Sequence, residues 1–317
     1  MFVCLLWVKF NRRMAEMNGI KYCLMVLVFS FLISGCNSIR PEPGQAVFGT
    51  PEEASEALVN AIKVNDTARL MEIFGSQGKN IVFSGDEKYD NDSRLWFVKK
   101  TEEKTAVVKG DVVGIEVGND KWPFPVPMVK YDGKWFFHTA AGLDEMVNRR
   151  IGRNELNAIN VCRTIVVAQN EFARLKTAEG AKEYALRFIS EKGKFNGLYW
   201  DDPGAKGKSP LGARIVLASH ETPLGKGRPY HGYYYMILIS QGADAPGGAK
   251  SYVSNGKMCN GFAIAAYPAE YGVSGIKTFM VSKNGVVFEK DMGADTAKVL
   301  PTMTQFNPDD TWTPARD

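Results

Sequence analysis

The chain of 317 residues is 45% hydrophobic and 23% charged, with a formal net charge of +4. It is long enough for one large or two modest domains, and hydrophobic enough to fold without disulfides or metals. The first 35 residues hold four basic residues and one acidic residue, so the 282 residues after them are close to neutral. Nucleic-acid binding calls for a concentrated basic face, and we therefore expect no nucleic-acid partner.

An apolar run over residues 23–33 follows Lys21. A helix needs roughly 20 apolar residues to span a bilayer, so this run is too short to cross. It has the length of the apolar region of a secretory signal peptide, and the lysine supplies the positive flank. We predict a signal peptide over residues 1–35. Three start codons remain open: Met1, Met14 or Met17.

The predicted signal peptide ends in Ile33-Ser34-Gly35-Cys36, which resembles the bacterial lipobox. The small residues let a peptidase approach the backbone, and the thiol accepts the lipid. We expect lipidation of Cys36, the alternative being an ordinary signal peptide that contains a cysteine. Asn37 follows rather than Asp, which in enteric-type bacteria favours the outer membrane. The resemblance implies a lipoprotein that faces the periplasm, with the membrane as a partner through the anchor.

Two cysteines, Cys162 and Cys259, remain after the anchor. Outside the cytoplasm they can form a disulfide, but two buried free thiols fit the sequence equally well. The three histidines (His138, His220 and His231) are scattered and no CxxC motif is present, so we expect no metal site. The segment GAKGKS lacks the first glycine of a phosphate-binding loop, and we predict no cofactor.

Residues 36–47 are polar and contain two prolines, which predicts a tether. A helix is expected after it, with Thr50 as N-cap, Pro51 in the first turn and Glu53 completing a capping box. A second helix is expected over residues 67–74.

Two strand-like segments follow, over residues 105–118 and 126–139. Asp132-Gly133 separates two alternating runs in the second segment, which predicts a hairpin. Two short helices followed by a curved antiparallel sheet resemble the nuclear-transport-factor-like cone fold. We therefore expect an N-terminal α+β domain over residues 48–142.

The pattern of residues 144–176 has a helical period, and Gly152 is expected to kink or divide this helix. The apolar stripe consists of Met146, Ile151, Leu156, Ile159, Ile165, Val166, Phe172 and Leu175. Several strands follow, among them segments 230–240, 261–269 and 276–282, and Asn284-Gly285 predicts a hairpin turn. A long helix packed on a small antiparallel sheet gives a second α+β domain over residues 143–317.

Six segments together resemble the uncharacterised bacterial DUF-2950 family: WPFPVPMV, NRRIGRNELNAINVCR, GLYW, GRPYHGYYYMIL, APGGAKSYV and YPAEYGVSGIKTFMVSKNGVVFEKDMG. The similarity extends from about Phe48 to Trp312. The resemblance implies no activity, and it brings no catalytic residues.

Residues 155–293 also resemble the globular part of type IV pilins and pseudopilins. In a pilin the apolar helix stands at the mature N-terminus, so that subunits pack into a filament. Here a whole domain precedes the helix, and its start carries several charged residues. The resemblance therefore implies a pilin-like fold without assembly into a pilus.

No catalytic signature is recognisable, because Ile276 replaces the last glycine of a nucleophile elbow and the paired aspartates stand in loop-like contexts. We expect a protein that is not an enzyme. Two groups are candidates for binding. Arg149, Arg150 and Arg153, with Glu155 beside them, form the first, since guanidinium groups hold carboxylates and phosphates. The alternative for this group is a network of ion pairs at a domain junction.

The second group lies in the segment RPYHGYYY and contains Arg228, Tyr230, His231 and Tyr233. Aromatic platforms of this kind bind sugars and peptides. The alternative is packing, since alternate residues of a strand share one face of a sheet.

Three functions remain open on the sequence. We expect first a non-enzymatic interaction or structural module of the cell envelope, in contact with another envelope protein or the cell wall. The alternative is a periplasmic protein that binds a small ligand or glycan, and the third hypothesis is a hydrolase with an unrecognised site.

Overall fold

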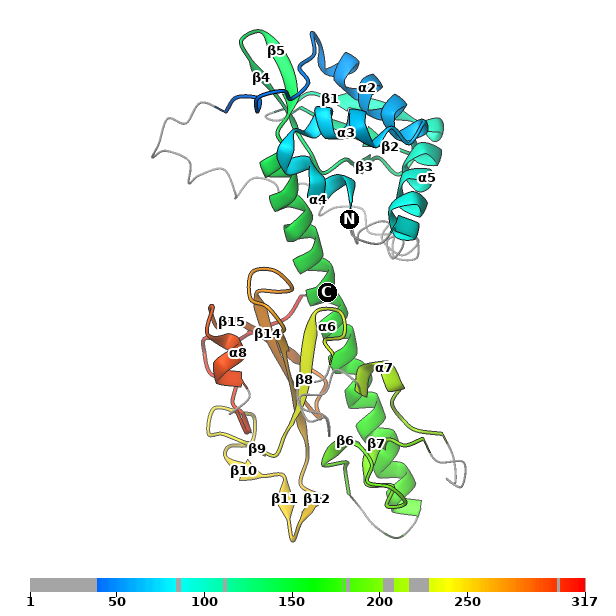
Figure 1. Ribbon diagram of the computed structural model, residues 1–317. Coiled ribbons are helices and arrows are strands. Elements are labelled where there is room, and N and C mark those ends of the chain that lie inside the picture. The colour runs from blue at the N-terminus through cyan, green and yellow to red at the C-terminus, as the bar shows by residue number, and fades with distance from the viewer. Residues whose placement is uncertain are drawn as a thin grey trace. The chain divides into compact units, whose positions relative to one another are not determined.

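The computed structural model describes residues 39–83, 87–110, 113–178, 180, 183–201, 208–216, 228–300 and 303–316. The protein is α+β, as predicted, and it forms two compact units (Figure 1). Unit 1 ends at Arg149 and unit 2 begins at Arg150, a few residues after the predicted boundary. The predicted signal peptide and Cys36 lie outside the described residues.

Unit 1 is built from short helices and two small antiparallel sheets. Its helices are α2 (Pro51–Lys63), α3 (Thr67–Phe74), the 3-10 helix η2 (Ser76–Gly78), α4 (Lys79–Val82) and α5 (Glu87–Glu103). Its strands are β1 (Thr105–Val108), β2 (Gly114–Val117), β3 (Trp122–Pro123), β4 (Met128–Tyr131) and β5 (Lys134–Phe137). One sheet has the order β1-β2-β3 and the other is the β4-β5 hairpin.

The predicted helix starts in unit 1 are confirmed. The Thr50 side chain accepts a hydrogen bond from the Glu53 backbone N–H at 3.1 Å. The Glu53 carboxylate in turn accepts from the N–H of Gly49, one residue earlier than in a regular capping box. Asp132 and Gly133 have φ angles of 46° and 78°, as the predicted two-residue hairpin turn requires.

The segment predicted as a tether is bonded to unit 1 from Glu42 onward, so that part of the prediction is wrong. The Gln45 side chain is buried, and it donates to the carbonyl oxygens of Ile73 and Phe137 at 3.0 and 2.8 Å. Ser76 donates from its backbone N–H and its hydroxyl to the Glu42 carboxylate. Because these partners lie 28 to 92 residues further along the chain, local polarity did not reveal them.

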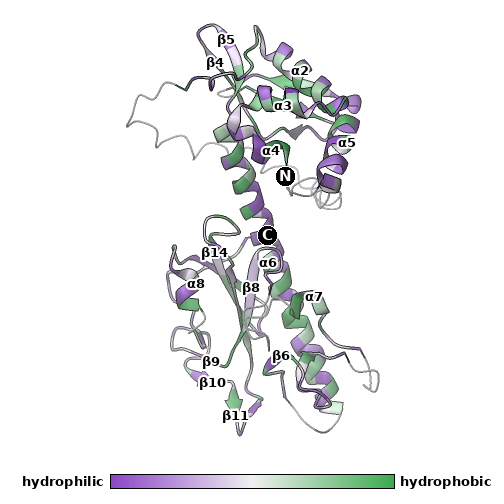
Figure 2. Cartoon of the chain, viewed as in Figure 1, coloured by the Kyte–Doolittle hydropathy of each residue, from purple (hydrophilic) through white to green (hydrophobic). Residues whose placement is uncertain are grey.

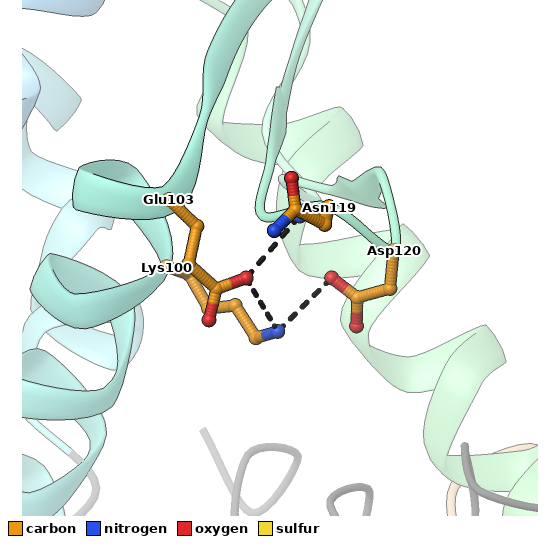
Figure 3. A network of polar contacts seen from close by, with 4 residues as sticks. All are labelled: Lys100, Glu103, Asn119 and Asp120. Carbon is orange, nitrogen blue, oxygen red and sulfur yellow. Dashed lines mark hydrogen bonds and ion pairs between the residues drawn. The ribbon is translucent and has the colours of Figure 1, made fainter.

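A polar network joins α5 to the turn between β2 and β3 (Figure 3). The Lys100 ammonium group contacts the Asp120 carboxylate at 3.1 Å and the Glu103 carboxylate at 3.2 Å. The Asn119 backbone N–H also donates to Glu103. Gly118 begins this turn at a φ of 79°, and a Cβ there would lie 2.7 Å from the Lys100 side chain. A larger residue at this position would displace the Asp120 and Lys100 side chains from the network.

We predict that Gly118→Ala lowers the free energy of unfolding of unit 1 by about 2–4 kcal/mol, because it adds a steric clash to an unfavourable backbone angle. The matched control is Gly133→Ala, which has a similar φ of 78° but open space around the new Cβ. That variant should lose only about 1 kcal/mol. Chemical denaturation of both variants measures the difference, and equal losses would contradict the proposed packing.

Helix α6 (Thr139–Ala178) is continuous, so the expectation that Gly152 divides it is wrong. Its residues 139–149 belong to unit 1 and the rest to unit 2. Six of the eight residues of the predicted stripe are buried: Met146, Ile151, Ile159, Ile165, Val166 and Phe172. Hydrophilic residues recur along α6 (Figure 2), and no helix within the described ranges has the length and apolarity to cross a membrane.

Unit 2 is centred on an antiparallel sheet with the order β17-β15-β14-β13-β8. Its strands are β8 (Tyr233–Leu238), β13 (Ala263–Pro268), β14 (Lys277–Ser282), β15 (Val287–Asp291) and β17 (Thr313–Pro314). The smaller strands are β6 (Arg187–Ile189), β7 (Gly197–Tyr199), β9 (Ser240–Gln241), β10 (Lys250–Ser251), β11 (Val253–Ser254), β12 (Lys257–Met258) and β16 (Gln305–Phe306). Two short helices, α7 (Ala213–Val216) and α8 (Thr296–Val299), complete the unit.

The large sheet is covered on both faces. Tyr233 and Phe279 pack ring against ring on one face, which meets the buried residues of α6. On the other face, Phe288 of β15 contacts Phe306 of β16. Every residue of β13 is consequently buried, which explains its uninterrupted apolar sequence.

Candidate functional site

The predicted group of arginines is divided between the two units. Arg149 belongs to unit 1, where its Nε donates to the Glu145 carboxylate at 2.7 Å and its Nη1 to the Pro123 carbonyl at 2.8 Å. Its guanidinium group also lies 5.6 Å from the centre of the Trp122 ring. These contacts hold the side chain against unit 1. Arg150 and Arg153 belong to unit 2.

Glu155, predicted as a binding residue, is engaged within unit 2. Its Oε1 accepts hydrogen bonds from the backbone N–H groups of Ile276 and Lys277, each at 2.9 Å. The neighbouring Asn154 donates from its side chain to the Ser274 carbonyl at 2.8 Å. The two side chains therefore fix the loop between β13 and β14 to α6.

The aromatic group around Tyr233 is also largely structural. Tyr233 is fully buried, and its hydroxyl donates to the Lys277 carbonyl at 2.8 Å. Burial raises the pKa of Tyr233 well above its usual value. Tyr230 and Tyr233 exchange two backbone hydrogen bonds that close a turn through His231, whose φ is 52°. Tyr233 is therefore a packing residue, which was the alternative interpretation of this segment. Arg228 is exposed.

His231 is half-buried, with its ring centre 4.1 Å from that of Tyr230. Burial lowers the pKa of this imidazole, and the positive charge of Arg153 lowers it further. Below about pH 6.5 the unfolded chain therefore binds a proton that the folded chain resists. Protonation of His231 consequently opposes folding, and the stability of unit 2 should fall as the pH falls through this range.

We predict that His231→Asn reduces the loss of stability of unit 2 between pH 7 and pH 5, since asparagine tolerates the positive φ and does not titrate. Amide hydrogen exchange in β13 and β14 reports on unit 2 alone. The control is His138→Asn, which changes a histidine of unit 1 and should leave the pH dependence of these amides in place. An unchanged pH dependence in His231→Asn would refute the assignment.

The two cysteines, Cys162 and Cys259, are not bonded to each other in the structure. Cys162 is fully buried on α6, and burial raises its pKa to about 12. Cys259 is half-buried, and its thiol contacts the side chain of Asn260. The buried Cys162 thiol therefore behaves as a small hydrophobic side chain rather than as a nucleophile. No three His, Cys, Asp or Glu side chains in the described ranges form a metal-binding group.

Unit 1 contains a cavity of about 80 Å³ that is partly open to solvent. Its walls are almost entirely apolar. Helix α5 and the segment after β2 provide several of the lining residues. The apolar lining residues are Ile62, Ile81, Phe97, Trp122, Phe124, Pro125 and Met146. Edge-on ring contacts between Phe97, Trp122 and Phe124 hold the aromatic wall together.

Three polar side chains complete the lining: Ser93, Arg94 and Arg149. Ser93 is 3% exposed, and its hydroxyl has no hydrogen-bond partner among the residues that the structure describes. A buried hydroxyl without a partner costs roughly 1–3 kcal/mol, and native proteins contain few of them. Both arginines are half-buried, and they contribute mainly carbon atoms to the lining. Apolar walls with a few polar groups are the usual features of a ligand site.

Of the residues that line this cavity, Arg149 was among the binding candidates predicted from the sequence and the others were not. α5 was not predicted, because most of its residues are polar and its apolar face is narrow. Ser93 and Phe97 lie four residues apart and therefore on one face of α5. This spacing is the feature of the sequence that could have indicated a helix with one buried face.

The fold and the cavity define a two-unit α+β protein whose first unit contains a small apolar cavity. Residues 45–315 match the family described as "Protein of unknown function (DUF2950)", and the chain belongs to this family. The resemblance stated from the sequence is thereby confirmed for the family. No curated protein and no solved structure matches the chain.

Proposed function

We propose that this protein is a non-enzymatic binding module of the cell envelope, and that the cavity of unit 1 takes the apolar part of a small ligand. The observation that carries the proposal is the partly open cavity of about 80 Å³, whose apolar wall includes the ring cluster of Phe97, Trp122 and Phe124. Concave apolar surfaces of this kind take the apolar part of a ligand. We propose that the partner of this module is another envelope protein or the cell wall, which would provide the ligand group.

The absence of a chemical step is part of this proposal. It is supported by the engagement of Glu155 and Tyr233, two of the predicted candidates, in hydrogen bonds with the backbone of unit 2. Hydrolysis of peptidoglycan fragments, glycosides or esters that is lost in a folded His231→Ala variant would overturn it.

Two finer likenesses also belong to this proposal. The order of helices, sheet and hairpin supports a nuclear-transport-factor-like cone in unit 1. The long helix followed by an antiparallel sheet supports a pilin-like fold in unit 2.

The envelope location depends on the lipobox-like sequence that ends at Cys36. We predict that the full chain, expressed in a Gram-negative bacterium, incorporates labelled fatty acid and partitions with the outer membrane. Cys36→Ala should abolish both, because the lipid is attached through this thiol. Cys23→Ala, which removes a cysteine from the predicted signal peptide, is the control and should retain both. Undiminished labelling of Cys36→Ala would exclude the anchor.

The cavity itself can be tested with xenon, which enters dry apolar cavities. We predict that xenon shifts the methyl resonances of Ile62, Ile81 and Met146, the aliphatic lining residues of unit 1. Ser93→Leu should abolish these shifts by filling the space. Glu102→Leu places the same side chain on an exposed position of α5 and should leave them in place. Absence of xenon shifts in the unaltered chain would count against a binding cavity.

A further inference from the structure

We infer that the β4-β5 hairpin of unit 1 is a second membrane contact, which binds the anionic phospholipid surface of the bilayer that holds the anchor. The contact is made by Val47, Lys130, Tyr131 and Lys134, which we call the hairpin surface. The inference goes beyond ligand binding in the cavity, and it rests on the envelope location that we propose.

The chain between the anchor and the hairpin is short. Ten residues, 37–46, separate Cys36 from Val47. The next residue, Phe48, exchanges two backbone hydrogen bonds of 2.8 Å with Trp135 of β5, so this segment runs beside the hairpin (Figure 1). An anchor at Cys36 therefore holds this side of unit 1 close to the bilayer.

The pairing of the strands places the exposed side chains on one face of the hairpin. Phe48 and Trp135 are direct partners, and both pack on the apolar core of unit 1. Successive side chains of a strand alternate between faces, so Val47 and Lys134 lie on the opposite face. Tyr131 is the partner of Lys134 and shares that face. Val47 is 40% exposed and Tyr131 is 39% exposed, so this face offers apolar surface to a partner.

The charges favour an anionic partner. Lys130 and Lys134 are exposed on either side of the turn, and no carboxylate within the described ranges pairs with either lysine. Asp132 is the one acidic residue of the hairpin sequence, and Arg40 is the one charged residue between the anchor and Glu42. Three cations against one carboxylate give this region a net charge of +2. Near an anionic bilayer, each such charge raises the affinity about fivefold.

The kinds of side chain favour a bilayer over a protein. Tyrosine combines an apolar ring with a polar hydroxyl and is enriched where membranes meet water. Lysine can lay its apolar stem on the same surface while its ammonium group stays among the lipid phosphates. At protein–protein interfaces, by contrast, lysine is depleted. Stable anchoring usually combines a lipid with a second signal such as a basic surface, and the hairpin surface supplies one.

The test uses the chain from residue 37 onward, held to vesicles by an N-terminal hexahistidine tag and a nickel-chelating lipid. Its outcome is therefore independent of lipidation at Cys36. Co-sedimentation in imidazole, which weakens the tag, measures the affinity for the vesicles. We expect an equimolar mixture of phosphatidylglycerol and phosphatidylcholine to bind the chain about twentyfold more tightly than phosphatidylcholine does, since two net charges contribute.

Lys130→Gln combined with Lys134→Gln should remove most of this gain. Tyr131→Ser should lower the affinity for both kinds of vesicle, because the ring contributes through burial rather than through charge. The matched control is Lys63→Gln combined with Lys99→Gln, which removes the same charge from exposed positions of α2 and α5. This control should keep the gain.

Equal losses in the two double variants would show that net charge alone attracts the chain, and would overturn the inference. Equal affinity of the unaltered chain for both kinds of vesicle would overturn it as well. A hairpin variant that keeps its full affinity for vesicles would also overturn it, and would leave these side chains for a protein partner. The proposed function fails separately, through the absence of fatty-acid labelling or of xenon shifts.

Discussion

The cavity of unit 1 depends on the charged side chains that hold α5 in place. Most residues of this helix are polar, so apolar burial alone holds it weakly. Arg94, in the middle of α5, donates hydrogen bonds to Asn65 after α2 and to Val82 at the end of α4. Lys100, near the end of α5, pairs with Asp120 in the turn before β3. The same helix supplies Ser93 and Phe97 to the cavity. The polar contacts that place α5 thus also place the polar and apolar parts of the site.

In unit 2, polar side chains also connect separate elements, here a helix and a sheet. The Gln169 side chain lies fully buried on α6, and its amide donates to and accepts from the backbone of Ala185 at 2.8 Å each way. Asn154 and Glu155 do the same for the loop before β14. Each of these amides and the Glu155 carboxylate thereby satisfies backbone groups that would otherwise lose their hydrogen bonds to water. Side chains that resemble ligand-binding groups in the sequence are, in this unit, the connections between helix and sheet.

The parts of the fold that follow from local chemistry were predictable. Thr50 and Glu53 mark the start of α2, Asp132-Gly133 marks a hairpin, and the period of α6 marks its buried face. The site was mostly not predictable, because its residues come from α2, α4, α5, α6 and the segment around β3. Only contacts between distant segments bring Ser93 beside Met146. Glycine also misled the interpretation at Gly152, since the surrounding residues favour the helix strongly enough to continue through it.

The hydrogen bonds of Glu42 and Gln45 set a limit on how far unit 1 can reach. With a lipid at Cys36, only residues 37–41 separate the membrane attachment from chain that is bonded to the fold. A fully extended chain covers at most about 3.6 Å per residue, so this connection spans roughly 20 Å. Unit 1 would then stay beside the lipid headgroups, and a molecule leaving the bilayer surface would meet it before it met anything deeper in the periplasm.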